Sequence, residues 1–388
     1  MSNHDVALVA AGQSKFGKRT DAGLRNLVFE ATRELFTKSE NISKEDIDAT
    51  VIGVAGDEFN GQGAPAAVSI DEIGLVGKPT IRVESACATG TAAIKTAYGL
   101  VKSGLHDTVL VIGVEKMTAV TTGKATELMA RAGDIRWEYP FGCTFPGFYA
   151  LLATAHMEKY GTTREMLSSV AVKNHYYGAR NPKAHLQKEV TLEQAMNSHP
   201  IAHPLNLFDC SLISDGAAAV VVTKADLAKK YTDAPVYIRG IGSGSDTMQI
   251  AQRETLTSLR GAKTAAQTAY KMAGVGPNDI DVAEVHDCFT IAEIIAYEDL
   301  GFAEPGKGGQ LALDKQTYIG GKVAVNVDGG LKSKGHPLGA TGVSQGAEIF
   351  HQLRGEVEKE RQVPGAEIGL SHNVGQSGQF VNVIIYGR

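Results

Sequence analysis

Short apolar runs alternate along the chain with longer stretches whose apolar positions recur every three or four residues. The short runs are rich in Val, Ile and Ala, which is typical of buried strands, and they include 51–55, 108–114 and 216–223. The longer stretches predict helices, among them 24–38, 90–103 and 262–273. Strands of this kind separated by helices favour an α/β fold with buried, mostly parallel sheets.

A long-period repeat divides the chain into two similar halves. The sequence ISKEDID at 42–48 precedes one apolar run, and VGPNDID at 275–281 precedes another. Further on, the apolar stretch 81–83 leads into ATGT, and the stretch 323–327 leads into ATGV. Because self-similarity constrains topology more than local propensity does, we expect two copies of one series of strands and helices.

A long insertion interrupts the first of these halves. We expect an N-terminal half at 1–117 and 206–232, an inserted loop domain at 118–205 and a C-terminal half at 233–388. Prolines break the inserted segment repeatedly, and it carries clustered aromatic residues, namely Trp137, Phe141, Phe145, Phe148 and Tyr149. Irregular segments over a scaffold commonly carry ligand sites, so we expect the insertion to cover one.

Composition narrows the class of protein. The 388 residues are 43% hydrophobic and 21% charged, which is typical of a globular protein with a large core. The net charge of −5 leaves no basic excess to neutralise phosphates, so we expect no nucleic-acid partner. Apolar runs are too short to span a membrane and the first five residues are polar, so we expect a cytoplasmic protein without a signal peptide or membrane contact.

The cysteine and histidine spacings do not indicate a metal centre. The four cysteines are widely spaced and include no CxxC pair. His199 and His203 have i, i+4 spacing, but Pro200 and Pro204 forbid the regular helix that would aim both side chains at one ion. We therefore expect no bound metal.

Cys87 occupies the junction between a predicted strand and a predicted helix, in the sequence ESACATGTAA. The N-terminus of a helix presents free N–H groups and a positive dipole end, which lowers the pKa of a thiol and favours the thiolate. The same N–H groups could hold a developing oxyanion. We therefore expect Cys87 to be a nucleophile, the alternative being a packed small side chain.

Two further motifs place histidines after predicted strands. The sequence GGLKSKGHPLGATG at 329–342 occupies the position in the second half that Cys87 has in the first. Its single histidine, His336, could take the proton of Cys87 if the halves face each other. The sequence VHDCFT brings together His286, which could polarise a carbonyl, and Cys288, which could shuttle protons; a purely structural hexapeptide is the alternative.

The motifs SACATGTAA, HDCF and GHPLGATG, in this order within a duplicated α/β frame, resemble the thiolase superfamily and specifically its archaeal and SCP-x-like branch. The resemblance covers essentially the whole chain. It implies a thiolase fold with five layers, α-β-α-β-α, in which two similar halves pack face to face with an inserted loop domain. It also implies a homodimer or a dimer of dimers.

The resemblance further implies roles for the motif residues. Cys87 would be the acylated nucleophile, activated by His336, while His336 and His286 would form the oxyanion site for the enolate. The backbone N–H groups of Cys87 and Gly375 would form a second oxyanion site. Substrate contacts would come from Asn373 in the loop SHNVGQSG, from Gly335 and from Phe289.

The sequence departs from commoner thiolases at two of these positions. His286 stands where many relatives have the Asn of an NEAF motif, and Asn373 stands where they have the second catalytic cysteine of a CxG motif. Cys288 of the HDCF motif is the expected substitute for that thiol. The residue that protonates the enolate therefore stays open between Cys288, His286 and a water molecule.

The activity implied by the resemblance is reversible condensation and thiolysis of 3-ketoacyl-CoA, such as the conversion of two acetyl-CoA into acetoacetyl-CoA and CoA. Coenzyme A would be a substrate, and we expect no permanently bound cofactor. One alternative is a thiolase-like subunit of an acyltransferase or aldolase complex with an OB-fold partner protein. Another is a non-catalytic protein that binds acyl-CoA or lipid. The presence of Cys87, His286, Cys288 and His336 together argues against this alternative.

Overall fold

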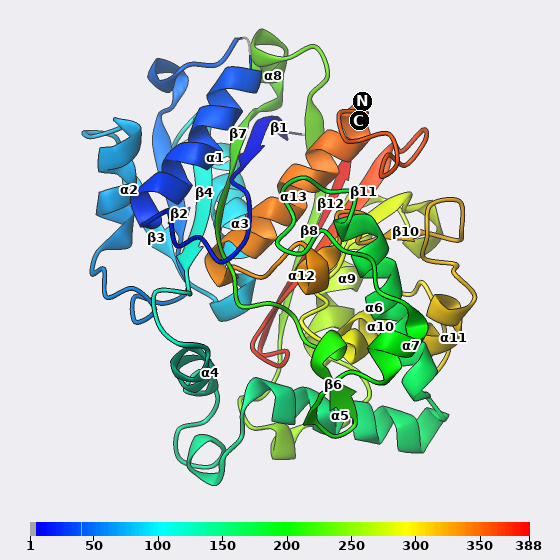
Figure 1. Cartoon of the computed structure of the whole chain (residues 1–388). Coiled ribbons are helices and arrows are strands. Elements are labelled where there is room, and N and C mark those ends of the chain that lie inside the picture. Colours follow the sequence, from blue (N-terminus) through cyan, green and yellow to red (C-terminus); the bar gives the residue numbers. More distant parts are fainter. Residues whose placement is uncertain (1–4, 40) are drawn as a thin grey trace.

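The computed structural model describes residues 5–39 and 41–388 (Figure 1). Most of the polar N-terminus on which the expectation about a signal peptide rests, residues 1–4, lies outside the described residues. Within the described part, ten strands form one sheet in the order β10-β9-β11-β12-β8-β1-β7-β4-β2-β3. No helix of this part is long and apolar enough to cross a membrane.

The sheet confirms the internal repeat. The first half contributes β1 (Val6–Gln13), β2 (Ala49–Gly53), β3 (Thr80–Val83), β4 (Thr108–Lys116) and β7 (Asp215–Lys224). The second half contributes β8 (Val236–Ser245), β9 (Val282–Glu284), β10 (Ala324–Val325), β11 (Ile368–Gly375) and β12 (Phe380–Gly387). The order β1-β7-β4-β2-β3 has the same pattern as β8-β12-β11-β9-β10. The halves meet where β1 pairs with β8, at Leu8 opposite Val236.

Helices and sheet form the five expected layers. The outer face of the first half is covered by α1 (Leu24–Lys38) and α2 (Pro65–Ile73), and that of the second half by α9 (Arg260–Ala273) and α10 (Thr290–Asp299). The middle layer consists of α3 (Thr89–Lys102) and α13 (Leu338–Arg354), which pack against each other and against strands of both halves (Figure 1). Buried residues of the middle layer and of strands in both halves, such as Ile94, Val111 and Ile384, share one apolar cluster.

The expectation of mostly parallel sheets is wrong. In each half the three strands farthest from the β1–β8 junction are parallel, but β7 and β12 run antiparallel to both of their neighbours. The physical reason is clearest in the second half, where β11 and β12 follow each other through a turn at 376–379. A short turn joins antiparallel strands, whereas a parallel pair needs a crossover of a dozen residues or more.

Two glycines explain how α3 and α13 come together. A Cβ atom on Gly90 would lie 2.5 Å from the backbone N of Val343, and one on Gly342 would lie 2.3 Å from Oδ1 of Asn373. Any side chain at either position would push the helices apart. The helix after Cys87 and the helix after His336 therefore start close together, which positions both residues at one end of the middle layer.

The segment between β4 and β7 is largely helical; α4, α5 and β6 lie in the lower part of Figure 1, and α6 lies higher, beside α10 and α12. It contains α4 (Thr122–Ala130), α5 (Phe145–Tyr160), α6 (Arg164–Gly178), α7 (Leu192–Met196), β5 (Pro200–Ala202) and β6 (Leu205–Asn206). Helices α5 and α6 pack against α10. Of its aromatic residues, Phe148 and Tyr149 are buried, while Trp137 and Phe141 are 67% and 75% exposed and do not contribute to a cover. The remaining helices are α8 (Ala225–Tyr231), α11 (Gly308–Leu313) and α12 (Gly330–Ser333).

Candidate active site

Cys87 lies in a strained turn that connects β3 to α3. The preceding residue, Ala86, has a φ of 49°, a value that a side-chain-bearing residue adopts only when its surroundings enforce it. Thr89 supplies that restraint, because its hydroxyl accepts the N–H of Ser85 at 2.9 Å and donates to the carbonyl of Ala86 at 2.6 Å. The turn holds Cys87 at 7% exposure, within a single 3-10 turn before the helix.

His336 is held with a free nitrogen. The Thr341 hydroxyl donates to the carbonyl of Pro337 at 3.0 Å, so it accepts the Nδ1–H of His336 at 2.7 Å. This network assigns the proton of the neutral ring to Nδ1. The other nitrogen, Nε2, is buried and has no hydrogen-bond partner among the described residues. Its lone pair is available to accept a proton.

His286 is held in the opposite tautomer. Oδ1 of Asn373 accepts the Thr91 hydroxyl at 3.1 Å, and Nδ2 of Asn373 donates to Nδ1 of His286 at 3.1 Å. With Nδ1 as an acceptor, the ring carries its proton on Nε2. This Nε2–H is also buried and unpartnered within the described part of the chain. This N–H is a free hydrogen-bond donor in the ring that lies beside Cys87 and His336.

The fold brings Cys87 and both histidines together. The Cys87 sulfur and one ring nitrogen each of His286 and His336 all lie within 4.8 Å of one another. The two rings are 5.1 Å apart at an interplanar angle of 81°. Among the described residues this is the group with a spacing that could also hold a metal ion, so the expectation that no metal is bound stays a prediction.

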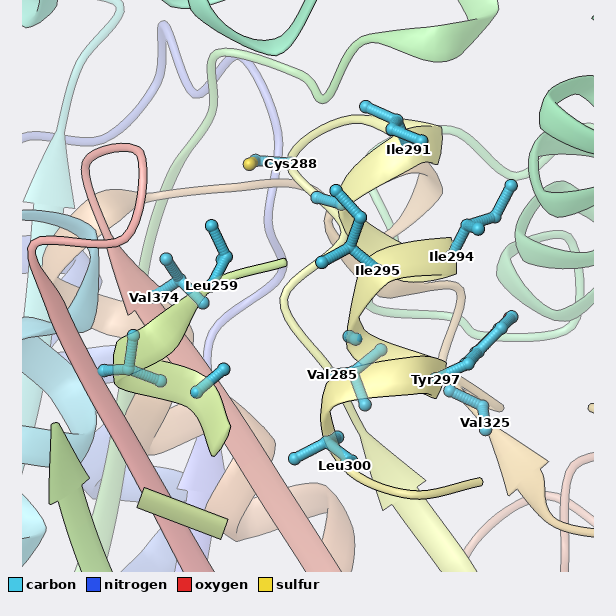
Figure 2. Close-up of a cluster of buried hydrophobic side chains, with 14 of the residues drawn as sticks. Leu259, Val285, Cys288, Ile291, Ile294, Ile295, Tyr297, Leu300, Val325 and Val374 are labelled. Atoms are coloured by element: carbon cyan, nitrogen blue, oxygen red, sulfur yellow. The ribbon is translucent and has the colours of Figure 1, made fainter. Parts of the chain in front are cut away.

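Cys288 completes the group from the start of α10 (Figure 2). It is 5% exposed, lines the same cavity as Cys87 and lies beside the phenol of Tyr149. Tyr149 comes from α5, donates to the carbonyl of Gln376 at 3.1 Å, and stacks on Phe289 with ring centroids 4.7 Å apart. Gln376 in turn directs its backbone N–H at the Cys87 sulfur. One tyrosine thus fixes the surroundings of both cysteines.

Burial favours the uncharged form of all four groups. It raises the pKa of Cys87 to about 12, against a smaller lowering by the N–H of Gln376, and it raises the pKa of Cys288 well above the usual range. It lowers the pKa of His336 to about 3 and that of His286 well below the usual range. The expectation that the helix N-terminus lowers the pKa of Cys87 is therefore wrong, because loss of hydration outweighs the helix dipole.

A cavity of about 160 Å³ opens onto Cys87, Cys288 and His336, whereas His286 lies behind its lining. Cys87, Cys288, Phe289, His336 and Gln376 form part of its wall. The rest of the wall is mainly apolar and comes largely from the segment between β4 and β7, including Met129, Phe145, Ile201, Leu207, Cys210 and Leu212. The segment thus walls much of the cavity, and its expected role as the cover of a ligand site stays a prediction.

Gly335 and Asn373 act from behind this lining. Gly335 has a φ of 115°, and a Cβ atom there would lie 2.6 Å from Oγ of Ser214, which accepts the N–H of His336 at 3.3 Å. Asn373 is fully buried on β11 and holds His286. A further buried group, Glu115 on β4, accepts the N–H of Ala55 at 2.8 Å and that of Gly339 at 3.0 Å, which ties the first half to the start of α13.

Comparison with known families agrees with this geometry. A model of the "Thiolase, N-terminal domain" matches residues 6–226, and a model described as "Thiolase C-terminal domain-like" matches residues 242–388. The chain belongs to the thiolase family. An acetyl-CoA acetyltransferase of Methanothermobacter thermautotrophicus is 46% identical over 99% of this chain and 100% of its own length. Human sterol carrier protein 2 is 34% identical over 97% of this chain and 71% of its own length.

Solved structures give the same result for the fold. The structure of an "Ltp2-ChsH2(DUF35) aldolase" has a TM-score of 0.86 and 25% identity, and covers 100% of this chain and 98% of that chain. Human mitochondrial 3-ketoacyl-CoA thiolase has a TM-score of 0.75 and 20% identity, and covers 100% and 99%. The family and the archaeal and SCP-x-like branch predicted from the motifs are therefore confirmed.

Sequence reasoning missed three residues at this thiolase site. Tyr149 stood out only as one of several aromatic residues in the insertion, and nothing in its spacing connected it to Cys288. Gln376 contributes a backbone N–H, which no side-chain pattern reveals. Cys210 lines the cavity because an isolated antiparallel β-bridge pairs its backbone with that of Phe289, next to the HDCF motif.

Proposed function

We propose that this thiolase is an acetyl-CoA acetyltransferase that forms and cleaves 3-ketoacyl-CoA through an acyl-enzyme on Cys87. The observation that carries the proposal is the cluster of the Cys87 sulfur with ring nitrogens of His286 and His336 inside 4.8 Å, beside the cavity. The relative from Methanothermobacter thermautotrophicus, which carries the same activity in its name, supports the choice of acetyl-CoA.

The first step transfers an acyl group to Cys87. His336 accepts the thiol proton on Nε2 as the sulfur attacks the thioester carbon of acetyl-CoA, and the resulting imidazolium returns that proton to the departing CoA thiolate. The proton moves during the attack, because neither a free thiolate nor a free imidazolium is stable in the buried pair. The backbone N–H groups of Cys87 and Gly375, with Gln376 beside them, are proposed to hold the oxyanion.

The second step forms a carbon–carbon bond. The Cys288 sulfur takes an α-proton from a second acetyl-CoA as the Cys288 thiol proton passes to Nε2 of His336. The enolate attacks the acyl-Cys87 carbon, and acetoacetyl-CoA leaves as the His336 imidazolium returns its proton to the Cys87 thiolate. The Nε2–H groups of His286 and of protonated His336 are proposed to stabilise the enolate oxygen. In cleavage the same protons move in reverse, and the Cys288 thiol protonates the enolate.

Substrate and partner contacts are part of the same proposal. Coenzyme A is a substrate, and no resident cofactor is required for any step. Phe289 contacts the acyl group, whereas Asn373 and Gly335 act by holding His286 and His336. We keep the homodimer or dimer of dimers, a cytoplasmic location and an OB-fold partner within the proposal. The similarity to an aldolase whose name joins Ltp2 to ChsH2(DUF35) supports the partner.

An aldolase subunit is the second candidate function, favoured by that same structural similarity. The two candidates differ in what they require of Cys87, because aldol cleavage needs no acyl-enzyme. Thiolysis of acetoacetyl-CoA by the purified chain, measured by the loss of its absorbance with and without co-purifying proteins, separates them. A rate that depends on free CoA supports the proposal, and no CoA-dependent loss in either preparation would overturn it.

A further inference from the structure

Asp287 stands between His286 and Cys288 and is fully buried, yet neither proposed step uses it. Its Oδ1 accepts the N–H of Leu331 at 2.7 Å, and its Oδ2 accepts the N–H of Lys332 at 3.2 Å. Both N–H groups belong to α12, the short helix that ends three residues before His336. One carboxylate therefore joins the loop that carries His286 and Cys288 to the loop that carries His336.

A second contact fixes this carboxylate from the insertion. Nδ2 of Asn174, on α6, lies 2.7 Å from Oδ2 of Asp287 and 2.7 Å from Oε2 of Glu293. Glu293 also pairs with Lys173 at 2.6 Å and accepts Nδ2 of Asn326 at 2.8 Å. Asn326 accepts the N–H of Val285 at 2.8 Å, so the network also fixes the strand end that precedes His286.

The backbone of α12 is shaped to admit Asp287. Gly330 has a φ of 56°, and a Cβ atom there would lie 2.4 Å from Oδ2 of Asp287. No side chain fits at this position while the carboxylate accepts the two N–H groups. The contact between Asp287 and α12 therefore depends both on the carboxylate and on the glycine at position 330.

We propose that Asp287, held by Asn174, is a positioning residue that sets His286 and Cys288 at their working distance from His336 and Cys87. The inference rests on the proposed function, because its consequence is specific to one step. Acylation of Cys87 needs only His336 and backbone N–H groups. Condensation needs groups from both loops at once, so displacement of one loop from the other slows condensation more than acylation.

Asp287→Asn tests this consequence. The amide keeps the volume of the carboxylate but offers one acceptor oxygen to two backbone donors, so Nδ2 faces an N–H and the loops separate. We expect the kcat for acetoacetyl-CoA synthesis to fall at least about 30-fold with little change in the KM for acetyl-CoA. We expect the rate of acylation, measured as the burst of acetyl-Cys87, to fall less than about fivefold. Removal of a general acid or base would lower it about 100-fold.

Asp299→Asn is the matched control. Asp299 is a buried carboxylate at the other end of α10, and it accepts the N–H of Leu259 and the hydroxyl of Ser258, each at 2.7 Å. Figure 2 shows Cys288 near one end of this helix and Leu300 beyond the other. The control should lower stability while leaving the ratio of condensation to acylation unchanged. Rates are counted per acylatable site, so that misfolded protein does not enter the ratio.

Asn174→Ala keeps the test decisive if Asp287→Asn does not fold, because it removes the bridge and leaves Asp287 in place. We expect a smaller change in the same direction. An unchanged ratio in whichever of these variants folds overturns the inference and leaves a purely structural role. Failure of the wild-type chain to acylate at all would instead contradict the proposed function, so the two failures are distinguishable.

Discussion

Single protons decide what the residues of this site can do. His336 and His286 are both buried and neutral, but Thr341 leaves a lone pair on His336, whereas Asn373 leaves an N–H on His286. The same side chain therefore offers a free acceptor at one position and a free donor at the other. We expect His336→Ala to lower turnover about 100-fold, the effect of a lost acid or base, with little change in melting temperature.

The pKa shifts predict how acylation depends on pH. Because the pKa of His336 is lowered to about 3, the ring is already the free base throughout pH 5.5–8.5 and gains nothing as pH rises. The burst of acetyl-Cys87, followed by quench and mass spectrometry, should therefore have a constant rate over this range. A rate that falls below about pH 6.5, the ordinary value for histidine, would contradict the lowered pKa.

The residue types were predictable from the sequence, but their protonation states were not. Cys87, His286, Cys288 and His336 each followed a predicted strand in a recognisable motif. Burial, which raises the pKa of Cys87 to about 12, depends on how deeply the turn packs. Local sequence does not reveal how deeply the turn is buried. It does indicate the helix N-terminus, which lowers the pKa of a thiol, whereas burial raises it.

At the scale of elements, the HDCF loop and the first turn of α10 carry the departure from commoner thiolases. Cys288→Ala should still acquire an acetyl group at Cys87, because that step needs only the nucleophile, its base and an oxyanion site. Condensation and thiolysis should both fail, because the amide of Asn373 cannot exchange a proton near neutral pH. Both rates are measured on one preparation, and an unchanged ratio would point to His286 or a water molecule as the acid.

The elements were predicted better than their contacts. The helix at 24–38 and the strands of both halves followed from apolar periodicity, which reports only which face of an element is buried. The antiparallel β7 and β12 did not follow, because Val-rich and Ala-rich runs look alike in either direction. The contact between Tyr149 and Cys288 joins α5 to α10, which are far apart in the sequence.

For the whole molecule, the contact between α3 and α13 decides whether the halves meet. Gly342→Ala would place a Cβ atom 2.3 Å from the Thr91 backbone N, and we expect a loss of about 3 kcal/mol in the free energy of unfolding from overpacking. Gly99→Ala in the same helix pair has open space around its Cβ and should instead gain about 0.5 to 1 kcal/mol from helix propensity. Chemical denaturation measures both, and equal effects would contradict the close contact.

The duplication was the strongest whole-chain signal in the sequence, and the matching strand orders confirm it. What the repeat could not reveal is that β1 and β8 join the halves into one continuous sheet through two residue pairs. Two symmetric halves have several faces that could pack together, and local periodicity does not choose among them. Gly90 and Gly342 allow one particular packing, because they let the backbones of α3 and α13 approach each other closely.

The central claim is that Cys87 carries the acyl group. The full-length protein is incubated with acetyl-CoA, digested and examined by peptide mass spectrometry, with Cys143→Ser as a control for a cysteine outside the cluster. We predict one acetyl group on Cys87 in the wild type and in the control, and neither acetyl group nor turnover in Cys87→Ser, because a serine hydroxyl is far less ionised than a thiol. An acetyl group on Cys288 with Cys87 unmodified would contradict the account.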